Sequence, residues 1–324
     1  MPTLKAFFDH EVKRAKIFLA TQVASMMGRK LEEGDWSKVY CQAKSIPHAG
    51  WSNLHIDVNH NGLGLEMKLL RIAQLKGKPL KSVCGTTLMH PAATRSIRID
   101  STKLPANDVM RDVFAQYAEL IRQRTMKVQE AAPGVRPDMR TGWLIWEDAL
   151  TEFLYFEEPM FPPNPKSFYS EWNTTPVRGA RKASKSLWVF DKKTNQKRYS
   201  VTTSAGIKIQ PYFDVPAPSD PNLYYFRVQS EPISPDTVCL WVASSTANAL
   251  RQQLGSLDRD VVSAAVMEVL SRKALPSSAP NLSEEVAVAI PLSIEAHSRL
   301  ITEWEAVSDE HRAQLLLKAL LRGT

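Results

Sequence analysis

The sequence has few cysteines and no long apolar run. Its three cysteines, Cys41, Cys84 and Cys239, are far apart and form no CxxC pair, so neither a disulfide framework nor a cysteine zinc site is indicated, and a reducing compartment is expected. No stretch approaches the ~20 apolar residues that cross a bilayer, and acidic Asp9 and Glu11 precede any apolar run. We therefore expect a cytoplasmic protein with no membrane partner.

Three common catalytic motifs are also missing. There is no GxxxxGK[ST] loop, no GxGxxG after a strand and no GxSxG elbow, so we expect no nucleotide cofactor, no dinucleotide redox chemistry and no serine hydrolysis. The net charge of +7 and the pI near 9.2 favour a polyanionic partner such as nucleic acid, although an ordinary basic enzyme has the same balance.

The periodicity of apolar residues predicts a mixed α/β protein. A stripe from Phe8 to Met26 predicts a helix that opens the chain, short strands are expected between about 50 and 90, and Asn107 is the expected N-cap of a long helix to Ala131. Proline-rich breaks follow. We expect a core at 1–131, a strand-rich section at 140–245 whose strands either grip a partner or extend the core sheet, and a helical section at 246–324.

Within the strand-rich section, 186–193 and 197–203 flank Thr194-Asn195-Gln196 and predict a β-hairpin. Further strands are expected at 206–213, 223–230 and 237–243. Beyond 246, the apolar spacing predicts four helices, at 246–255, 260–273, 293–307 and 310–321.

The most informative segment is HIDVNHNGLGLEMKLL, residues 55–70. Asn61-Gly62 favours a two-residue type I′ turn, which would pair His60 with Leu63 and Asp57 with Glu66. Alternation then separates two faces. One face carries His55, Asp57, Glu66 and Lys68, and the other, expected to be core, carries Ile56, Val58, Leu65, Met67 and Leu69.

Two carboxylates directly opposed across a hairpin repel each other, so a positive group is needed between Asp57 and Glu66. Mg²⁺ prefers hard oxygen ligands and commonly takes one or two carboxylates plus substrate phosphate. Lys68, on the same face, would orient or deprotonate the attacking water and stabilise negative charge on a phosphate.

Asp57 followed by Glu66-Met67-Lys68 resembles the D…(D/E)-x-K signature of the PD-(D/E)XK nucleases, which include many bacterial restriction endonucleases. GLGLEMK followed by GKPLKS at 77–82 is most similar to the MutH and Sau3AI branch, and the resemblance covers about residues 55–90. It departs from the pattern at Ile56, which replaces proline, at Leu69 and Lys81, which replace threonine and glutamate, and in a longer spacer.

The resemblance implies Mg²⁺ held by Asp57, Glu66 and the Met67 carbonyl, with Lys68 acting on the water and with 5′-phosphate products. It also implies a bacterial cytoplasmic protein with a restriction-endonuclease-like core. The related branch has an acid upstream, for which Glu32 or Glu33, at the end of the first helical region, is a candidate.

Two other interpretations of this segment remain open. The four polar residues could be the solvated outer face of a hairpin, with the cations offsetting the acids. His48, His55 and His60 could instead join Asp57 as ligands of a transition metal or as an HNH-type site, although their spacing fits no standard zinc pattern.

Basic residues suggest where DNA would bind. Arg95 and Arg98 follow the motif, near His90, and a denser run extends from Arg178 into the expected hairpin as far as Arg198. Cations on a hairpin suit phosphate contacts, whereas the alternative is an ordinary solvated face. The run consists of Arg178, Arg181, Lys182, Lys185, Lys192, Lys193, Lys197 and Arg198.

The function expected from the sequence is that of a type II restriction endonuclease. It would recognise and cut double-stranded DNA with Mg²⁺, as a homodimer whose two active sites match a palindrome. The alternatives are a MutH-like nicking enzyme that acts with mismatch-repair partners and a non-catalytic DNA-binding protein.

Overall fold

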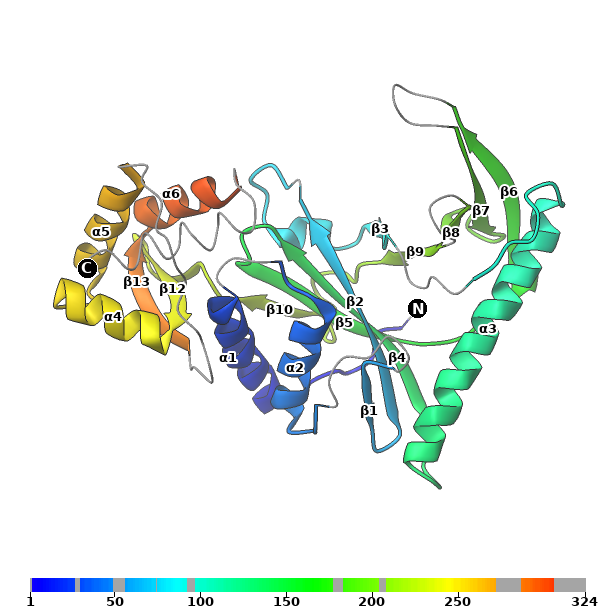
Figure 1. Ribbon diagram of the computed structural model, residues 1–324, viewed down its shortest axis with the longest axis horizontal. Helices are drawn as coiled ribbons and strands as arrows, with labels where there is room; N and C mark the ends of the chain where they lie inside the picture. Colours follow the sequence, from blue (N-terminus) through cyan, green and yellow to red (C-terminus); the bar gives the residue numbers. More distant parts are fainter. Residues whose placement is uncertain are drawn as a thin grey trace.

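The computed structural model describes residues 2–26, 30–48, 56–73, 75–91, 97–176, 183–203, 208–271 and 287–305. Three β-sheets with their covering helices follow one another along the long axis (Figure 1). The protein is therefore a mixed α/β protein, as the periodicity predicted.

The central sheet has the strand order β1-β2-β4-β5-β10. β2 and β4 run parallel over ten residue pairs, and the other neighbours are antiparallel. The strands are β1 (Val58–His60), β2 (Leu63–Ile72), β4 (Asp138–Glu147), β5 (Glu152–Pro159) and β10 (Tyr224–Arg227).

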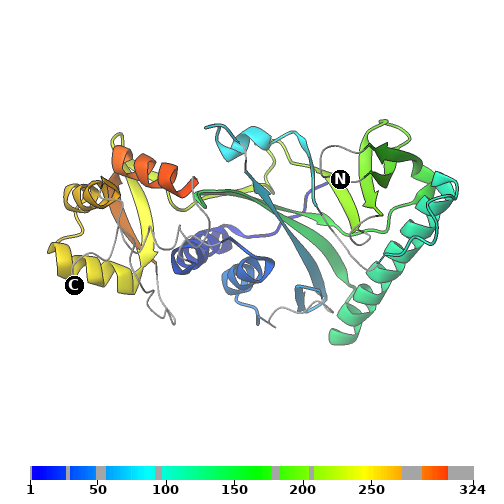
Figure 2. The ribbon, with the colours of Figure 1, turned by 45° about the horizontal axis from the view of Figure 1, so that its top comes forward.

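One face of the central sheet is covered by α1 (Asp9–Ser25) and α2 (Glu33–Lys44). Side chains that alternate along the strands, such as Leu65, Met67 and Leu144, pack there against the two helices. Figure 2 shows both helices on the same side of the sheet. This face holds the largest apolar core of the described residues.

The opposite face of the central sheet is divided along its strands. Toward one end it packs against the 3₁₀ turn Leu80–Val83 and Phe213, and toward the other against Ile121 and Val128 of α3 (Ala106–Ala131). The polar side chains of β2, β4 and β5 lie between these two apolar clusters.

The second sheet has the order β3-β9-β8-β7-β6 and packs on the N-terminal half of α3. Val113 and Phe114 of the helix contact Leu187 and Val189 of β7 in one core. Its strands are β3 (Thr87–Met89), β6 (Phe168–Thr175), β7 (Ser184–Asp191), β8 (Lys197–Thr202) and β9 (Lys208–Asp214), and the 3₁₀ turn Pro165–Ser167 precedes β6.

A third layer lies at the other end of the long axis (Figure 1). Its sheet, in the order β11-β12-β13, is covered by three helices around an apolar core of its own. The elements are β11 (Glu231–Ser234), β12 (Thr237–Ala243), α4 (Ser244–Leu254), α5 (Arg259–Ser271), β13 (Ala287–Ser293) and α6 (Ile294–Glu305).

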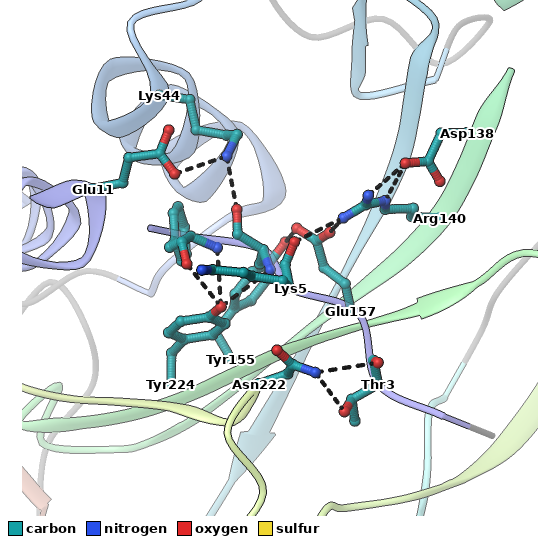
Figure 3. A network of polar contacts seen from close by, with 12 residues as sticks. Thr3, Lys5, Glu11, Lys44, Asp138, Arg140, Tyr155, Glu157, Asn222 and Tyr224 are labelled. Carbon is teal, nitrogen blue, oxygen red and sulfur yellow. Dashed lines mark hydrogen bonds and ion pairs between the residues drawn. The ribbon is translucent and has the colours of Figure 1, made fainter. Parts of the chain in front are cut away.

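A buried polar network attaches the segment before α1 to the central sheet (Figure 3). Glu157, fully buried, accepts hydrogen bonds from Arg140 and Tyr155 at 2.8 Å each. Arg140 also donates to the Lys5 carbonyl, and the Tyr224 hydroxyl accepts the backbone N–H of Phe7. A buried carboxylate needs such partners because desolvation of an unpaired charge is costly.

The Asn61-Gly62 turn forms as predicted. Both residues have positive φ, 46° and 82°, and His60 pairs with Leu63. The Gly62 carbonyl also accepts the Asp138 backbone N–H at 2.8 Å, directly before β4 pairs with β2. The same turn therefore sets the register on both sides of β2.

Several other predicted elements are confirmed. The hairpin around Thr194-Asn195-Gln196 is β7 and β8, and the three later strands correspond to β9, β10 and β12. Helices at 246–255, 260–273 and 293–307 correspond to α4, α5 and α6. The helix expected at 310–321 lies outside the described residues.

Other expectations were wrong. Pro105, not Asn107, is the N-cap of α3, and the Asn107 side chain instead accepts the Ser170 backbone N–H. Phe8 is 55% exposed because it precedes the first helix rather than joining its buried stripe. The section expected to be helical contains β13, whose alternation was missed.

The expected boundary at 131 does not coincide with a break in the sheet. Strands β4, β5 and β10 all follow residue 131 in sequence, yet they belong to the same sheet as β2. These three strands therefore extend the core sheet, which was one of the two arrangements expected for the later strands. In the part of the chain that the structure describes, no helix combines the length and the apolar character that a bilayer span requires.

The turn provides a stability test. A Cβ on Gly62 would lie 2.5 Å from Val135 Cγ1, in addition to the positive φ, whereas at Gly134 the φ is also positive but the space is open. We expect Gly62→Ala to lower the free energy of unfolding by about 3 kcal/mol and Gly134→Ala by about 1 kcal/mol. Urea unfolding measures both values, and equal losses would show that the Val135 contact contributes nothing.

Candidate active site

Asp57 stands directly before β1, where the hairpin leaves regular pairing. Its Oδ2 accepts the Met67 backbone N–H at 2.6 Å, and its own carbonyl accepts the Ser37 hydroxyl of α2 at 3.4 Å. The backbone bend at Asp57 also reverses the expected placement of Ile56, which packs with Ile121 and Val128 near α3 and not with the opposite core.

Glu66 and Lys68 lie on the face of β2 that points toward α3. Each is only 7% exposed. Lys68 Nζ is 2.8 Å from Glu66 Oε1, and Arg124 of α3 places a guanidinium nitrogen 3.1 Å from Glu66 Oε2. Both oxygens of this carboxylate are therefore paired with a cation.

The candidate upstream acids are Glu32 and Glu33, of which Glu33 contacts Lys68. Glu33 Oε1 is 3.6 Å from Lys68 Nζ. Glu32 is exposed and is the N-cap of α2, with its backbone N–H donated to Asp35. The two acids thus begin a second helix rather than end the first, and only Glu33 joins Lys68.

The site carries more negative than positive charge. Burial, and then the charge of Glu66, raise the pKa of Asp57 to about 7. Burial opposes protonation of Lys68, but the negative charges of Glu66 and Glu33 outweigh it and raise the pKa of this lysine. Lys68 therefore stays protonated at neutral pH, which suits a hydrogen-bond donor better than a general base.

Glu66 and Lys68 line one wall of a cleft of about 390 Å³. The opposite wall comes from β8 and β9 of the second sheet, and α3 closes one side. Arg198 and Asp214, on that far wall, form a paired contact through two hydrogen bonds of 2.8 and 2.6 Å. Prominent lining residues are Glu66, Lys68, Tyr117, Arg124, Glu158 and Arg198.

The donor set fits a small hard cation. Asp57 and Glu66 supply carboxylate oxygens, and Met67 directs its carbonyl to the same edge of β2 as its N–H, which points at Asp57. Among the described residues, no three His, Cys, Asp or Glu side chains gather closely enough to hold a metal. A cation here would depend on two carboxylates, a carbonyl and other oxygen ligands.

Two groups of this site, Arg124 and Glu158, were not predicted from the sequence. Arg124 lies on the same face of α3 as Tyr117, Ile121 and Val128. A cation within an otherwise apolar stripe is the sequence feature that could have indicated a buried ion pair. Glu158 is 7% exposed and accepts the Trp143 indole N–H at 3.1 Å, and burial raises its pKa.

Glu158 lies two strands away from Glu66. The two residues flank Thr141 in one row across β2, β4 and β5, and two strand spacings amount to about 10 Å. Glu157 and Glu158 are adjacent in sequence, but alternation directs one into the Figure 3 network and the other into the cleft.

The described cations of the basic hairpin mostly contact the protein itself. Lys185 Nζ donates to the Thr102 carbonyl at 2.5 Å, and Lys192 Nζ donates to the Lys166 carbonyl at 3.0 Å. Lys197 Nζ lies 3.4 Å from the centre of the Trp188 ring, and burial lowers its pKa to about 8. Arg198 is paired with Asp214, and Lys193 is exposed.

Several candidate residues lie elsewhere. Arg98 is exposed beside α3, and its backbone groups bond to Gln116. His48 is exposed, and His60 lies at the hairpin tip next to the turn. Arg95, Arg178, Arg181, Lys182 and His55 lie outside the described residues.

The chain was compared with family models, curated proteins and solved structures. None matches.

The raised pKa of Asp57 predicts a pH effect on stability. A carboxyl whose folded pKa exceeds its unfolded value contributes stability below pH 4 that is lost as the pH rises through 7. Asp57→Asn removes this loss, so we expect the metal-free variant to be about 2 kcal/mol more stable than wild type at pH 8, with a smaller difference at pH 5. Urea unfolding in EDTA measures both values.

The control for this prediction is Asp112→Asn, because Asp112 is an exposed carboxylate on α3. It should change stability little at either pH. A pH-independent effect of Asp57→Asn, or a loss of stability at pH 8, would contradict the assignment of a raised pKa to Asp57.

Proposed function

We propose that this protein is a Mg²⁺-dependent endonuclease of the PD-(D/E)XK type that cuts double-stranded DNA at a specific sequence, as a type II restriction enzyme does. The observation that carries the proposal is the position of Asp57 on the Met67 backbone N–H, between the residues of the Glu66–Lys68 ion pair, which lines a cleft. These are the groups that the D…(D/E)-x-K signature requires together.

In this proposal Asp57, Glu66 and the Met67 carbonyl hold the cation. Bound Mg²⁺ supplies positive charge to the phosphate and acidifies water. The reaction is hydrolysis: a water oxygen bonds to phosphorus, the P–O3′ bond breaks, one proton leaves the water to solvent, and the 3′ oxygen takes up a proton. The products are a 5′-phosphate and a 3′-hydroxyl.

Lys68 contributes as an ammonium. Its raised pKa keeps the ammonium protonated, and its contacts with Glu66 and Glu33 fix the position of that group. It would orient the attacking water and stabilise the negative charge that accumulates on the phosphate oxygens. Ser37 and the Met67 N–H hold Asp57 in place through its carbonyl and carboxylate.

Recognition of duplex DNA is supported by the second sheet, which forms the far wall of the cleft and carries the exposed cation Lys193 in the turn of its hairpin. The net charge of +7 favours a polyanionic substrate. Two copies related by a two-fold axis would present two such sites to a palindrome, so we propose a homodimer on DNA.

Digestion of plasmid and phage DNA tests the proposal. We expect discrete fragments with Mg²⁺ and none with EDTA, and Glu66→Gln and Lys68→Met should each slow cleavage at least ~10²-fold because each loses a charge at the reacting phosphate. Glu119→Gln, an exposed carboxylate on α3, is the matched control and should cut normally.

The form of the products separates the related functions. Linear fragments with 5′-phosphates support the restriction activity, whereas open circles alone would replace it with nicking. DNA binding that ignores Mg²⁺, without cleavage of any tested DNA, would refute the enzyme and leave a binding protein.

A further inference from the structure

The strongest unexplained contact near the site is made by Arg124. Its guanidinium reaches from α3 across to β2 and pairs with Glu66 Oε2 at 3.1 Å. The Glu66 side chain is 9% exposed and that of Arg124 28%, so the pair lies at the boundary between the protein interior and the cleft. Arg124 belongs to no part of the D…(D/E)-x-K signature.

Arg124 pairs with a Glu66 oxygen that a bound cation would also need. Lys68 holds Glu66 Oε1 and Arg124 holds Oε2, yet a cation held by Glu66 needs one of these oxygens. Lys68 lies on the same strand as Glu66, and a second acid, Glu33 of α2, also holds it in place. Arg124 is the more exposed partner, so it is the group that a cation would displace from Glu66.

Formal charges point in the same direction. Asp57, Glu66 and Glu33 carry three negative charges when ionised, against two positive charges from Lys68 and Arg124. A divalent cation would turn the resulting deficit of one positive charge into an excess of one, and a single phosphodiester would then neutralise the site. A displaced guanidinium would find that phosphate as its new anionic partner.

We propose that Arg124 is a substrate-binding catalytic residue that exchanges partners. It neutralises Glu66 while the site lacks a metal ion, and it binds the phosphodiester to be cut once a divalent cation occupies Glu66. The inference rests on the proposed function. The planar guanidinium suits this role because two parallel N–H groups match two phosphate oxygens.

The backbone of Arg124 is well placed for such an exchange. N-terminal to Arg124, Val113 and Phe114 anchor the helix in the second-sheet core. On either side of Arg124 in sequence, Ile121 and Val128 pack against the central sheet. Only the side chain has to move. Arg124 and Glu66 both line the cleft in which the phosphate would lie.

The proposal predicts effects of opposite sign. Removing Arg124 removes a cation that competes for Glu66, so Arg124→Gln should bind Mg²⁺ about 5-fold more tightly in the absence of DNA, as expected for a charge pair worth about 1 kcal/mol. The same variant should cleave DNA at least ~10²-fold more slowly in single turnover at saturating Mg²⁺. Arg124→Lys should retain part of the rate.

Isothermal titration with Mg²⁺ alone and single-turnover cleavage measure the two effects. Arg122→Gln is the matched control, because Arg122 is a nearby arginine of α3 that pairs with exposed Glu119 and does not line the cleft. It should change neither quantity. Circular dichroism and the thermal midpoint identify any variant that fails to fold, and Arg124→Met, which also removes the charge, then serves for both measurements.

The outcomes separate this inference from the proposed function. Wild type that cleaves while Arg124→Gln keeps its full rate overturns the inference alone, as does weaker Mg²⁺ binding by Arg124→Gln. Wild type that cleaves no DNA under any condition overturns the proposed function and with it the phosphate-binding role of Arg124.

Discussion

The Asn61-Gly62 turn is the constraint on which the central sheet depends. Its two positive φ values fix the pairing of β1 with β2, and the Gly62 carbonyl fixes the start of β4 through the Asp138 N–H. A slip of one residue would turn every side chain of β2 to the other face. Glu66 and Lys68 would then enter the apolar core, and Met67 would take their place in the cleft.

That register also explains why the polar groups are tolerated inside the protein. Glu66 and Lys68 form an ion pair between two residues of β2. Arg124 of α3 pairs with the other oxygen of the Glu66 carboxylate. Asp57 is the exception, since its nearest partner is a backbone N–H rather than a cation. Burial and the charge of Glu66 therefore disfavour the ionised form of this one carboxyl group.

Local signals determined what could be predicted. A tight turn and strict alternation specify a hairpin by themselves, so the pairing from His60 to Val58 was predictable from sequence. The bend at Asp57 was not, because it depends on a contact between its side chain and the Met67 backbone. The partnership of Arg124 with Glu66 joins segments 58 residues apart, and no periodicity within either segment encodes that distance.

The shared use of α3 limits how this protein can diverge. The helix is about 39 Å long, and its two halves belong to different hydrophobic cores. Substitutions in the second sheet must preserve the angle at which Val113 and Phe114 pack the helix against it. Otherwise the C-terminal half of α3, which carries Arg124, shifts relative to Glu66. We therefore expect substitutions in the second sheet to fall in its loops and outward-facing side chains, while the residues that pack against α3 stay constant.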